Sequence, residues 1–76
     1  MITWVIYDIS ENKIRNKVIR ICKDAGLYRV QKSVFLGDIE ENRFNEIQLV
    51  FQDLIDLEND SVYVFPMSKN ELKIAG

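Results

Sequence analysis

One acidic residue stands out as a side chain that could do chemistry. Asp8 ends an otherwise apolar segment, in the sequence YDIS. One interpretation is a turn carboxylate that accepts backbone N–H groups before the next helix. The other is a ligand for a hard cation, because Mg²⁺ commonly binds one or two carboxylates together with waters and substrate phosphate. A two-fold axis near Asp8 would supply the second carboxylate from a partner chain.

Several cations occupy the first half of the chain: Lys13, Arg15, Lys17, Arg20, Arg29 and Lys32. Lys13, Lys17 and Arg20 fall on one stripe of a predicted helix, which indicates either a solvated helix face or a phosphate-contacting surface. Arg15 lies about one turn beyond the first predicted strand, so we expect it near Asp8. Arg29 lies in the second predicted strand, where a basic residue is less common than on the surface of a helix.

Two aromatic residues, Tyr7 and Phe35, lie in predicted strands. Aromatic rings stack on the bases of single-stranded nucleic acids, but they also fill the cores of small domains. The sequence leaves both interpretations open. Cys22 lies on the apolar side of the first predicted helix and is interpreted as a packing residue. The acidic residues of the second half are interpreted as solvated surface: Glu40, Glu41, Glu46, Asp53, Asp56, Glu58 and Asp60.

The composition excludes several classes of site. The 76 residues contain no histidine, which excludes histidine general bases, Ser-His triads and zinc sites that need imidazole. The single cysteine excludes disulfides within the chain, and the three separated glycines exclude glycine-rich phosphate loops. The net charge of −2 argues only weakly against a nucleic-acid partner, because a local basic patch can outweigh it.

The N-terminal segment MITWVIYDI is apolar, but it is too short to span a membrane and has no basic region before it. It is therefore interpreted as neither a signal peptide nor a transmembrane helix. We expect a cytoplasmic protein with no membrane partner.

The elements that position these residues follow from hydrophobic periodicity. Residues 2–9 are β-branched and aromatic, which predicts a strand whose alternate side chains point to opposite faces. By this alternation Asp8 shares its face with Ile2, Trp4 and Ile6. A helix is predicted over residues 11–25, with Ser10 as the N-cap and Gly26 just beyond its end.

The second half of the chain repeats this alternation of strands and helices. Residues 27–31 and 34–39 predict two strands of a hairpin that turns at Lys32 and Ser33, although one long bent strand is the alternative. A second helix is predicted over residues 41–57, opened by Glu41 or Asn42. A fourth strand follows over residues 61–67, where Pro66 marks its end or an edge position.

This order of elements predicts one α+β domain over residues 1–76. The pattern β-α-β-β-α-β is that of the ferredoxin-like fold, a four-stranded antiparallel sheet with two helices on one face. A short C-terminal strand is expected near Leu72 to Ala75. The other face of the sheet would carry exposed apolar side chains, which is improbable on a soluble monomer. We therefore expect a symmetric dimer that buries this face.

The sequence resembles a known family in three segments. MITWVIYDIS followed by a helix with Arg15, then RVQKSVFLGDI, then DSVYVFPM, is similar to the small CRISPR-associated endonuclease-fold family. This family is the non-integrase member of the protein pair that acquires new spacers. The resemblance covers nearly the whole chain in the same order, and the three segments together are specific.

The resemblance implies roles for individual residues. It implies a homodimer of sheets packed face to face, with Asp8 paired across the axis as a catalytic ligand for Mg²⁺ or Mn²⁺. It places Tyr7, Arg15, Arg29 and Phe35 at positions tied to cleavage or contact of nucleic acid. Lys17 stands where some members carry arginine, and Lys17 and Arg20 are expected to contact nucleic acid as well. Lys32 stands where an aromatic residue is common, and the C-terminal LKIAG resembles a strand that reaches onto the partner subunit.

The resemblance also implies a function. The family includes metal-dependent endonucleases on RNA or on double-stranded DNA as well as members that show no activity, and the family dimer bridges the CRISPR integrase subunits during spacer acquisition. Two alternatives remain open. One is a scaffold with no turnover, and the other is a toxin-like ribonuclease of the virulence-associated type on the same fold.

Overall fold

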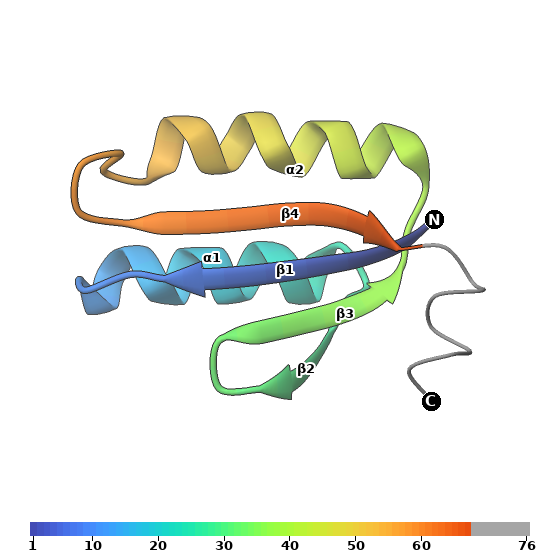
Figure 1. Ribbon diagram of the computed structural model, residues 1–76, viewed down its shortest axis with the longest axis horizontal. Coiled ribbons are helices and arrows are strands. Elements are labelled where there is room, and N and C mark those ends of the chain that lie inside the picture. Colours follow the sequence, from blue (N-terminus) through green and yellow to red (C-terminus); the bar gives the residue numbers. More distant parts are fainter. Residues whose placement is uncertain (68–76) are drawn as a thin grey trace.

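The computed structural model describes residues 1–67 of the chain. Its elements are β1 (Ile2–Asp8), α1 (Asn12–Asp24), β2 (Tyr28–Gln31), β3 (Val34–Asp38), α2 (Glu41–Leu54) and β4 (Ser61–Met67). The strands form one sheet in the order β2-β3-β1-β4, and every neighbouring pair is antiparallel. Figure 1 shows α1 passing behind β1 and α2 running alongside β4. The expected ferredoxin-like α+β fold is therefore confirmed, and the predicted C-terminal strand lies outside the described residues.

The face of the sheet under the helices forms the core. Thr3, Val5 and Tyr7 of β1 are buried there, as the alternation of the strand predicts. Phe35 of β3 and the apolar sides of both helices complete the same cluster. Cys22 belongs to it, and burial raises the pKa of its thiol to about 12, so the cysteine is a packing residue as expected. Neither α1 nor α2, the helices in this part of the chain, has the length and apolarity that crossing a bilayer requires.

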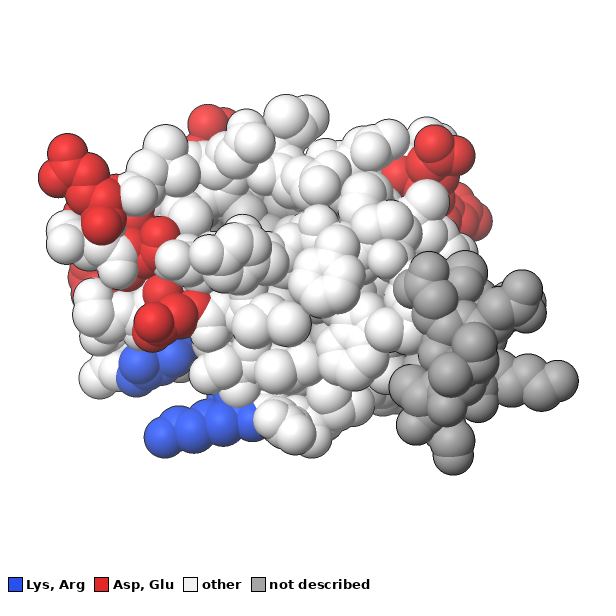
Figure 2. Space-filling view, in the orientation of Figure 1, with Lys and Arg blue, Asp and Glu red and all other residues white. Residues whose placement is uncertain are grey.

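The opposite face of the sheet is uncovered within residues 1–67. Ile2, Trp4 and Ile6 lie on it, half-buried, and one row across all four strands consists of Tyr28, Leu36, Trp4 and Phe65. The indole N–H of Trp4 donates to the sulfur of Met67 at 3.2 Å. Figure 2 views this face and shows that its centre carries no charged side chain. The sequence prediction of an apolar, uncovered sheet face is thus confirmed.

The start of α1 differs from the prediction. Glu11, not Ser10, occupies the N-cap position, and its side chain makes no capping hydrogen bond. The backbone N–H of Ser10 instead donates to a carboxylate oxygen of Asp60, which comes from far along the chain. The other end is as predicted, because Gly26 follows the C-cap with φ of 93°, a conformation that favours glycine.

The remaining boundaries agree closely with the sequence prediction. The predicted hairpin is confirmed over the alternative of one long bent strand, with a turn at Lys32 and Ser33 and an irregular pairing between Arg29 and Gln31. Helix α2 ends at Leu54, three residues before the predicted end, because Ile55 is already extended. Strand β4 has the predicted bounds, and Pro66 lies in this edge strand, the kind of strand in which proline is tolerated.

Candidate functional site

An open recess of about 320 Å³ lies at the end of β1. It is lined by residues from β1, the β1–α1 junction, α1, β2 and the turn between β2 and β3: Asp8, Ile9, Arg15, Arg29, Lys32 and Ser33. Three cationic side chains and one carboxylate therefore line the same recess. The sequence predicted that Arg15 lies near Asp8, and the recess brings these two residues together.

Asp8 is the last residue of β1 and lies opposite Ser61 of β4. Its side chain is exposed on the uncovered side of the sheet, as the alternation predicts. Among residues 1–67 it accepts no hydrogen bond and forms no ion pair. The interpretation of Asp8 as a turn carboxylate is therefore wrong in this structure, and Asp8 instead lines the recess.

The turn carboxylate is Asp60, which the sequence analysis assigned to solvated surface. Only 9% of Asp60 is exposed. One oxygen accepts the backbone N–H of Ser10 at 3.3 Å, and the other accepts the N–H of Asp56 at 3.2 Å. Asp60 thus joins the segment after Asp8 to the loop before β4. Its position directly before a predicted strand is the only sequence signal for this role.

Arg15 is held at the wall of the recess by its own helix start. One guanidinium nitrogen donates to the carbonyl of Ile9 at 3.1 Å, and the other donates to the side-chain oxygen of Asn12. The side chain is half-buried. These bonds fix the guanidinium at the recess that Asp8 also lines, although no ion pair joins the two within the described residues.

Arg29 is held by a network that begins in the core. Its Nε and Nη2 donate to the carbonyl of Lys32 at 3.2 and 2.8 Å, and Nη2 also donates to the hydroxyl of Tyr7 at 3.4 Å. The Tyr7 hydroxyl donates to the same Lys32 carbonyl at 2.9 Å. The guanidinium carbon lies 5.9 Å from the centre of the Phe35 ring, within the range of a cation–π contact. Arg29 is therefore oriented by hydrogen bonds and by an aromatic surface.

Tyr7 and Phe35 lie in the core. Tyr7 is 2% exposed and Phe35 is fully buried, and their ring centres are 6.2 Å apart. A base cannot stack on either ring in this structure, so the stacking interpretation from the sequence is corrected. Their contribution to the recess is indirect, because both contact the guanidinium of Arg29.

The lysine-rich stripe lies elsewhere. Lys13, Lys17 and Arg20 are exposed on α1, as predicted, and none of them lines the recess. The cations that the sequence grouped together therefore divide into two sets. Arg15, Arg29 and Lys32 surround Asp8, whereas the stripe of α1 faces solvent.

A metal ion would find a single carboxylate in the recess. Within residues 1–67 no three acidic or cysteine side chains come together as a ligand set. One carboxylate, with waters and a substrate phosphate, is a donor set that Mg²⁺ accepts. Asp8 fits a magnesium site of this open kind, and a second chain would have to supply any further carboxylate.

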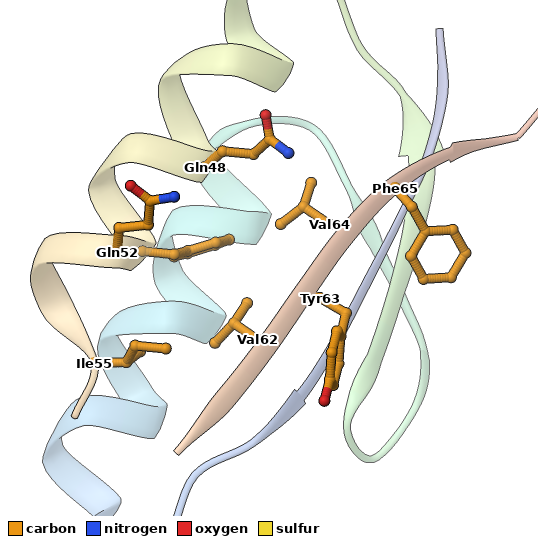
Figure 3. Close-up of a pocket in the computed structure, with 8 residues that line it drawn as sticks. Gln48, Gln52, Ile55, Val62, Tyr63, Val64 and Phe65 are labelled. Carbon is orange, nitrogen blue, oxygen red and sulfur yellow. The ribbon is translucent and has the colours of Figure 1, made fainter. Parts of the chain in front are cut away.

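A second hollow, of about 330 Å³, lies between α2 and the edge strand β4. Figure 3 shows Val62 and Val64 pointing from β4 toward α2, while Tyr63 and Phe65 point to the other side of the strand. Gln48 and Gln52 of α2 also line the hollow. The outer edge of β4 has no neighbouring strand in the part of the chain that the structure describes.

Comparison with known proteins identifies the family. The profile of the family described as CRISPR associated protein Cas2 matches residues 1–74. A protein of Desulforudis audaxviator named CRISPR-associated endoribonuclease Cas2 is 39% identical over 75 residues, which cover 99% of this chain and 71% of that protein. A Cas1/Cas2 endonuclease fusion of Thermoproteus tenax is 29% identical over 72 residues, covering 95% of this chain and 27% of the fusion.

The fold comparison agrees with the sequence comparison. The crystal structure of Cas2 from Streptococcus pyogenes superposes with a TM-score of 0.83 at 29% identity, covering 97% of this chain and 94% of that one. The same order of elements and the family profile therefore coincide over nearly the whole length. The chain belongs to the CRISPR-associated Cas2 family.

Proposed function

We propose that this chain acts in the cytoplasm as a homodimeric, single-domain subunit of CRISPR adaptation that binds nucleic acid at the end of β1. The observation that carries this proposal is the recess that Asp8 lines together with Arg15, Arg29 and Lys32, where the carboxylate has no partner among residues 1–67. Cations held beside an open carboxylate suit a phosphodiester and a divalent cation together.

The dimer follows from the uncovered face of the sheet. Its central row of Tyr28, Leu36, Trp4 and Phe65 forms an apolar surface of a kind that soluble monomers seldom leave in water. A second copy that packs on this face would bury it and would bring a second Asp8 toward the axis. The free edge of β4, beside the hollow in Figure 3, is a place where the C-terminal segment of the second copy could add a strand.

The arginines of the recess are proposed to position the phosphate. Arg15 and Arg29 already have fixed guanidinium groups, so a phosphate that binds them finds donors in place. Tyr7 and Phe35 are positioning residues in this scheme, because they act through Arg29. The exposed stripe of Lys13, Lys17 and Arg20 would contact the backbone of a longer duplex.

Asp8 is proposed to hold Mg²⁺ or Mn²⁺ together with its copy in the partner chain. When bound, the ion would lower the pKa of a water and neutralise charge on the scissile phosphate. Arg15 and Arg29 would orient the phosphate beside the two carboxylates. The relative from Desulforudis audaxviator is named an endoribonuclease, which supports RNA as a substrate, with double-stranded DNA as the other candidate.

The second candidate is a scaffold that bridges the integrase subunits and does not cleave. The fusion of a Cas2 to a Cas1 in Thermoproteus tenax favours it, since fused chains commonly work in one assembly. Both candidates require nucleic-acid binding and an integrase partner. The family membership favours either of them over the toxin-like ribonuclease.

The substitution Asp8→Asn separates cleavage from scaffolding. The amide keeps nearly the same shape but removes the charge that would hold the ion, so Mg²⁺-dependent cleavage of RNA or duplex DNA should fall by orders of magnitude. Folding should survive, because Asp8 makes no hydrogen bond within residues 1–67. Asp24→Asn, on the exposed end of α1, is the matched control and should cleave like the natural protein.

The outcome in cells decides between the two candidates. Spacer acquisition that persists in Asp8→Asn supports the scaffold, and its loss together with cleavage supports the nuclease. A folded variant that cleaves as well as the natural protein would show that Asp8 holds no catalytic metal. A variant that does not fold would indicate that Asp8 has a structural role instead.

A further inference from the structure

Among the described residues that line the recess at the end of β1, Ser33 supplies the one uncharged polar side chain. It lies in the turn between β2 and β3 and is half-buried. Serine is common in turns because its hydroxyl bonds nearby backbone groups. Within residues 1–67 the hydroxyl of Ser33 makes no such bond, nor a bond to any other group. The usual local reason for a serine in a turn is therefore missing here.

The free hydroxyl of Ser33 is open to solvent. No side-chain nitrogen or oxygen of a half-buried or buried residue in the described chain is both sealed from solvent and without a hydrogen-bond partner. Since Ser33 is half-buried and its hydroxyl has no partner in this part of the chain, that oxygen must be accessible. A ligand can therefore bond the hydroxyl without first breaking a hydrogen bond among residues 1–67.

The backbone that carries this hydroxyl is held by Tyr7, the residue before Asp8. The backbone N–H of Tyr7 donates to the carbonyl of Ser33 at 3.1 Å. The phenol of the same tyrosine donates to the carbonyl of Lys32 at 2.9 Å. Both residues of the turn are thus tied directly to the strand that ends in Asp8, so the hydroxyl is presented from a fixed backbone.

The other polar side chains of the recess each have one kind of hydrogen-bonding capacity. Arg15, Arg29 and Lys32 can only donate, and an ionised Asp8 can only accept. Both arginines already use part of their donors within the protein, on the carbonyls of Ile9 and Lys32. A phosphate group presents several acceptor oxygens, and serine hydroxyls are common donors to them. A hydroxyl adds such a donor to the recess without adding charge.

We propose that the hydroxyl of Ser33 donates a hydrogen bond to an oxygen of the phosphate that Arg15 and Arg29 position. This inference rests on the proposed function, because it needs a nucleic-acid phosphate in the recess. The hydroxyl contributes a directional, uncharged contact, whereas the cations contribute an attraction that salt weakens. Ser33 is then a binding residue of the site, and its contribution differs in kind from that of its neighbour Lys32.

Equilibrium binding of RNA and DNA duplexes of the same sequence to the full-length chain tests the inference, in EDTA so that neither duplex is cleaved. Ser33→Ala should bind both at least about tenfold more weakly, because it removes a hydrogen bond to a charged group. The slope of log affinity against log salt concentration should stay as in the natural protein, since no charge is removed. Ser33→Thr keeps a hydroxyl and should retain most of the affinity.

Two further variants are matched controls. Lys32→Ala, at the neighbouring turn position, removes a cation and should reduce the salt slope by about one per site. Ser61→Ala removes the hydroxyl of a half-buried serine in β4 that does not line the recess, and it should bind as the natural protein does. Thermal unfolding should show nearly unchanged stability for Ser33→Ala, because its hydroxyl has no partner within residues 1–67.

Each other outcome counts against the inference. A Ser33→Ala variant that binds as tightly as the natural protein overturns it and leaves the proposed function intact. A loss of affinity accompanied by a smaller salt slope also overturns it, because the substitution would then have displaced the cations. A loss confined to RNA overturns the phosphate as the target, since the hydroxyl would then bond the ribose 2′-OH. A natural protein that binds neither duplex overturns the inference and the proposed function together.

Discussion

The helices cover one face of the sheet and leave the other uncovered within the described residues, and both faces contribute residues to the candidate functional site. The face under the helices is sealed, with Val5 and Phe35 fully buried. The other face presents Trp4 and its neighbours to solvent in the described chain. At the end of β1 the two faces supply different parts of one site, because Tyr7 points into the core and Asp8 points out of it.

This division shows how a small sheet can form a polar recess with few polar residues in its core. The covered face supplies rigidity, since Tyr7 and Phe35 are locked in the core and orient Arg29. The uncovered face supplies the carboxylate, whose partner is proposed to come from a second chain. Substitutions on the covered face should therefore change stability first, and substitutions on the uncovered face should change assembly first.

The largest effect is expected for Phe35→Ala on the covered face. Removal of a fully buried aromatic ring leaves a cavity, and such changes cost about 3–5 kcal/mol of the free energy of unfolding. Denaturant unfolding at fixed protein concentration would measure this loss. Phe65→Ala, an aromatic truncation on the uncovered face, is the control and should cost the isolated chain much less. Equal losses would contradict the contrast between the faces.

The next effect is expected for Trp4→Ala on the uncovered face. If this face is the dimer interface, Trp4 lies in its central row, where truncation of an anchor commonly costs about 2 kcal/mol or more of the free energy of binding. The dimer dissociation constant should then rise at least about 30-fold. Analytical ultracentrifugation over a range of concentrations would measure it.

The exposed Leu57→Ala serves as the control for assembly, because Leu57 lies in the loop after α2 and not on the sheet. It should leave the dissociation constant of the dimer unchanged. A stable monomer of the natural protein at micromolar concentration would remove the dimer from the proposal altogether. The apolar face would then need another partner.

Much of this contrast could be predicted from the sequence. The alternation in residues 2–9 assigns Tyr7 and Asp8 to opposite faces, and the bounds of β4 follow from a local run of β-branched and aromatic residues. The end of α1 could also be predicted from local sequence, because Gly26 adopts a positive φ, a conformation that favours glycine. Local patterns sufficed wherever neighbours in sequence decide the conformation.

The errors arose where distant residues decide. Glu11 rather than Ser10 is the N-cap, and the backbone N–H of Ser10 donates to Asp60, fifty positions later, a contact that no local pattern predicts. From the sequence the phenol of Tyr7 could equally have stacked on a base, and only the structure shows its hydroxyl bonded to the Lys32 carbonyl and to Arg29. The pairing of the hairpin is irregular between Arg29 and Gln31, just before that carbonyl, and this irregularity has no signature in the sequence.

A smaller effect is expected for Tyr7→Phe. Tyr7 lies on the covered face, and its hydroxyl bonds Arg29, which lines the recess. The change keeps the ring in the core but removes one hydrogen bond to Arg29 and one to Lys32, and a net loss of about 1 kcal/mol in stability is expected. Nucleic-acid affinity should fall by a few-fold, since Arg29 keeps its bonds to the Lys32 carbonyl. Calorimetry and binding titrations would measure the two losses. A loss of affinity as large as that of Arg29→Ala would show that Tyr7 contacts the ligand directly.

The smallest effect concerns the loop that holds the end of β1 in register with β4. A hydrogen bond from the Asn59 side chain, followed by one from the backbone N–H of Glu58, lowers the pKa of Asp56 below the usual range of an aspartate. A carboxylate whose pKa falls on folding stabilises the native state above its unfolded pKa, and that contribution is lost as the pH falls through the folded pKa. Asp56 is fully exposed, so its share of the fall in unfolding midpoint on acidification should be slight, and Asp56→Asn should reduce that fall only a little. An NMR titration that places the pKa of Asp56 at or above the usual aspartate range would show that these bonds do not form in solution. The loop would then not contribute to the alignment of Asp8 with Ser61.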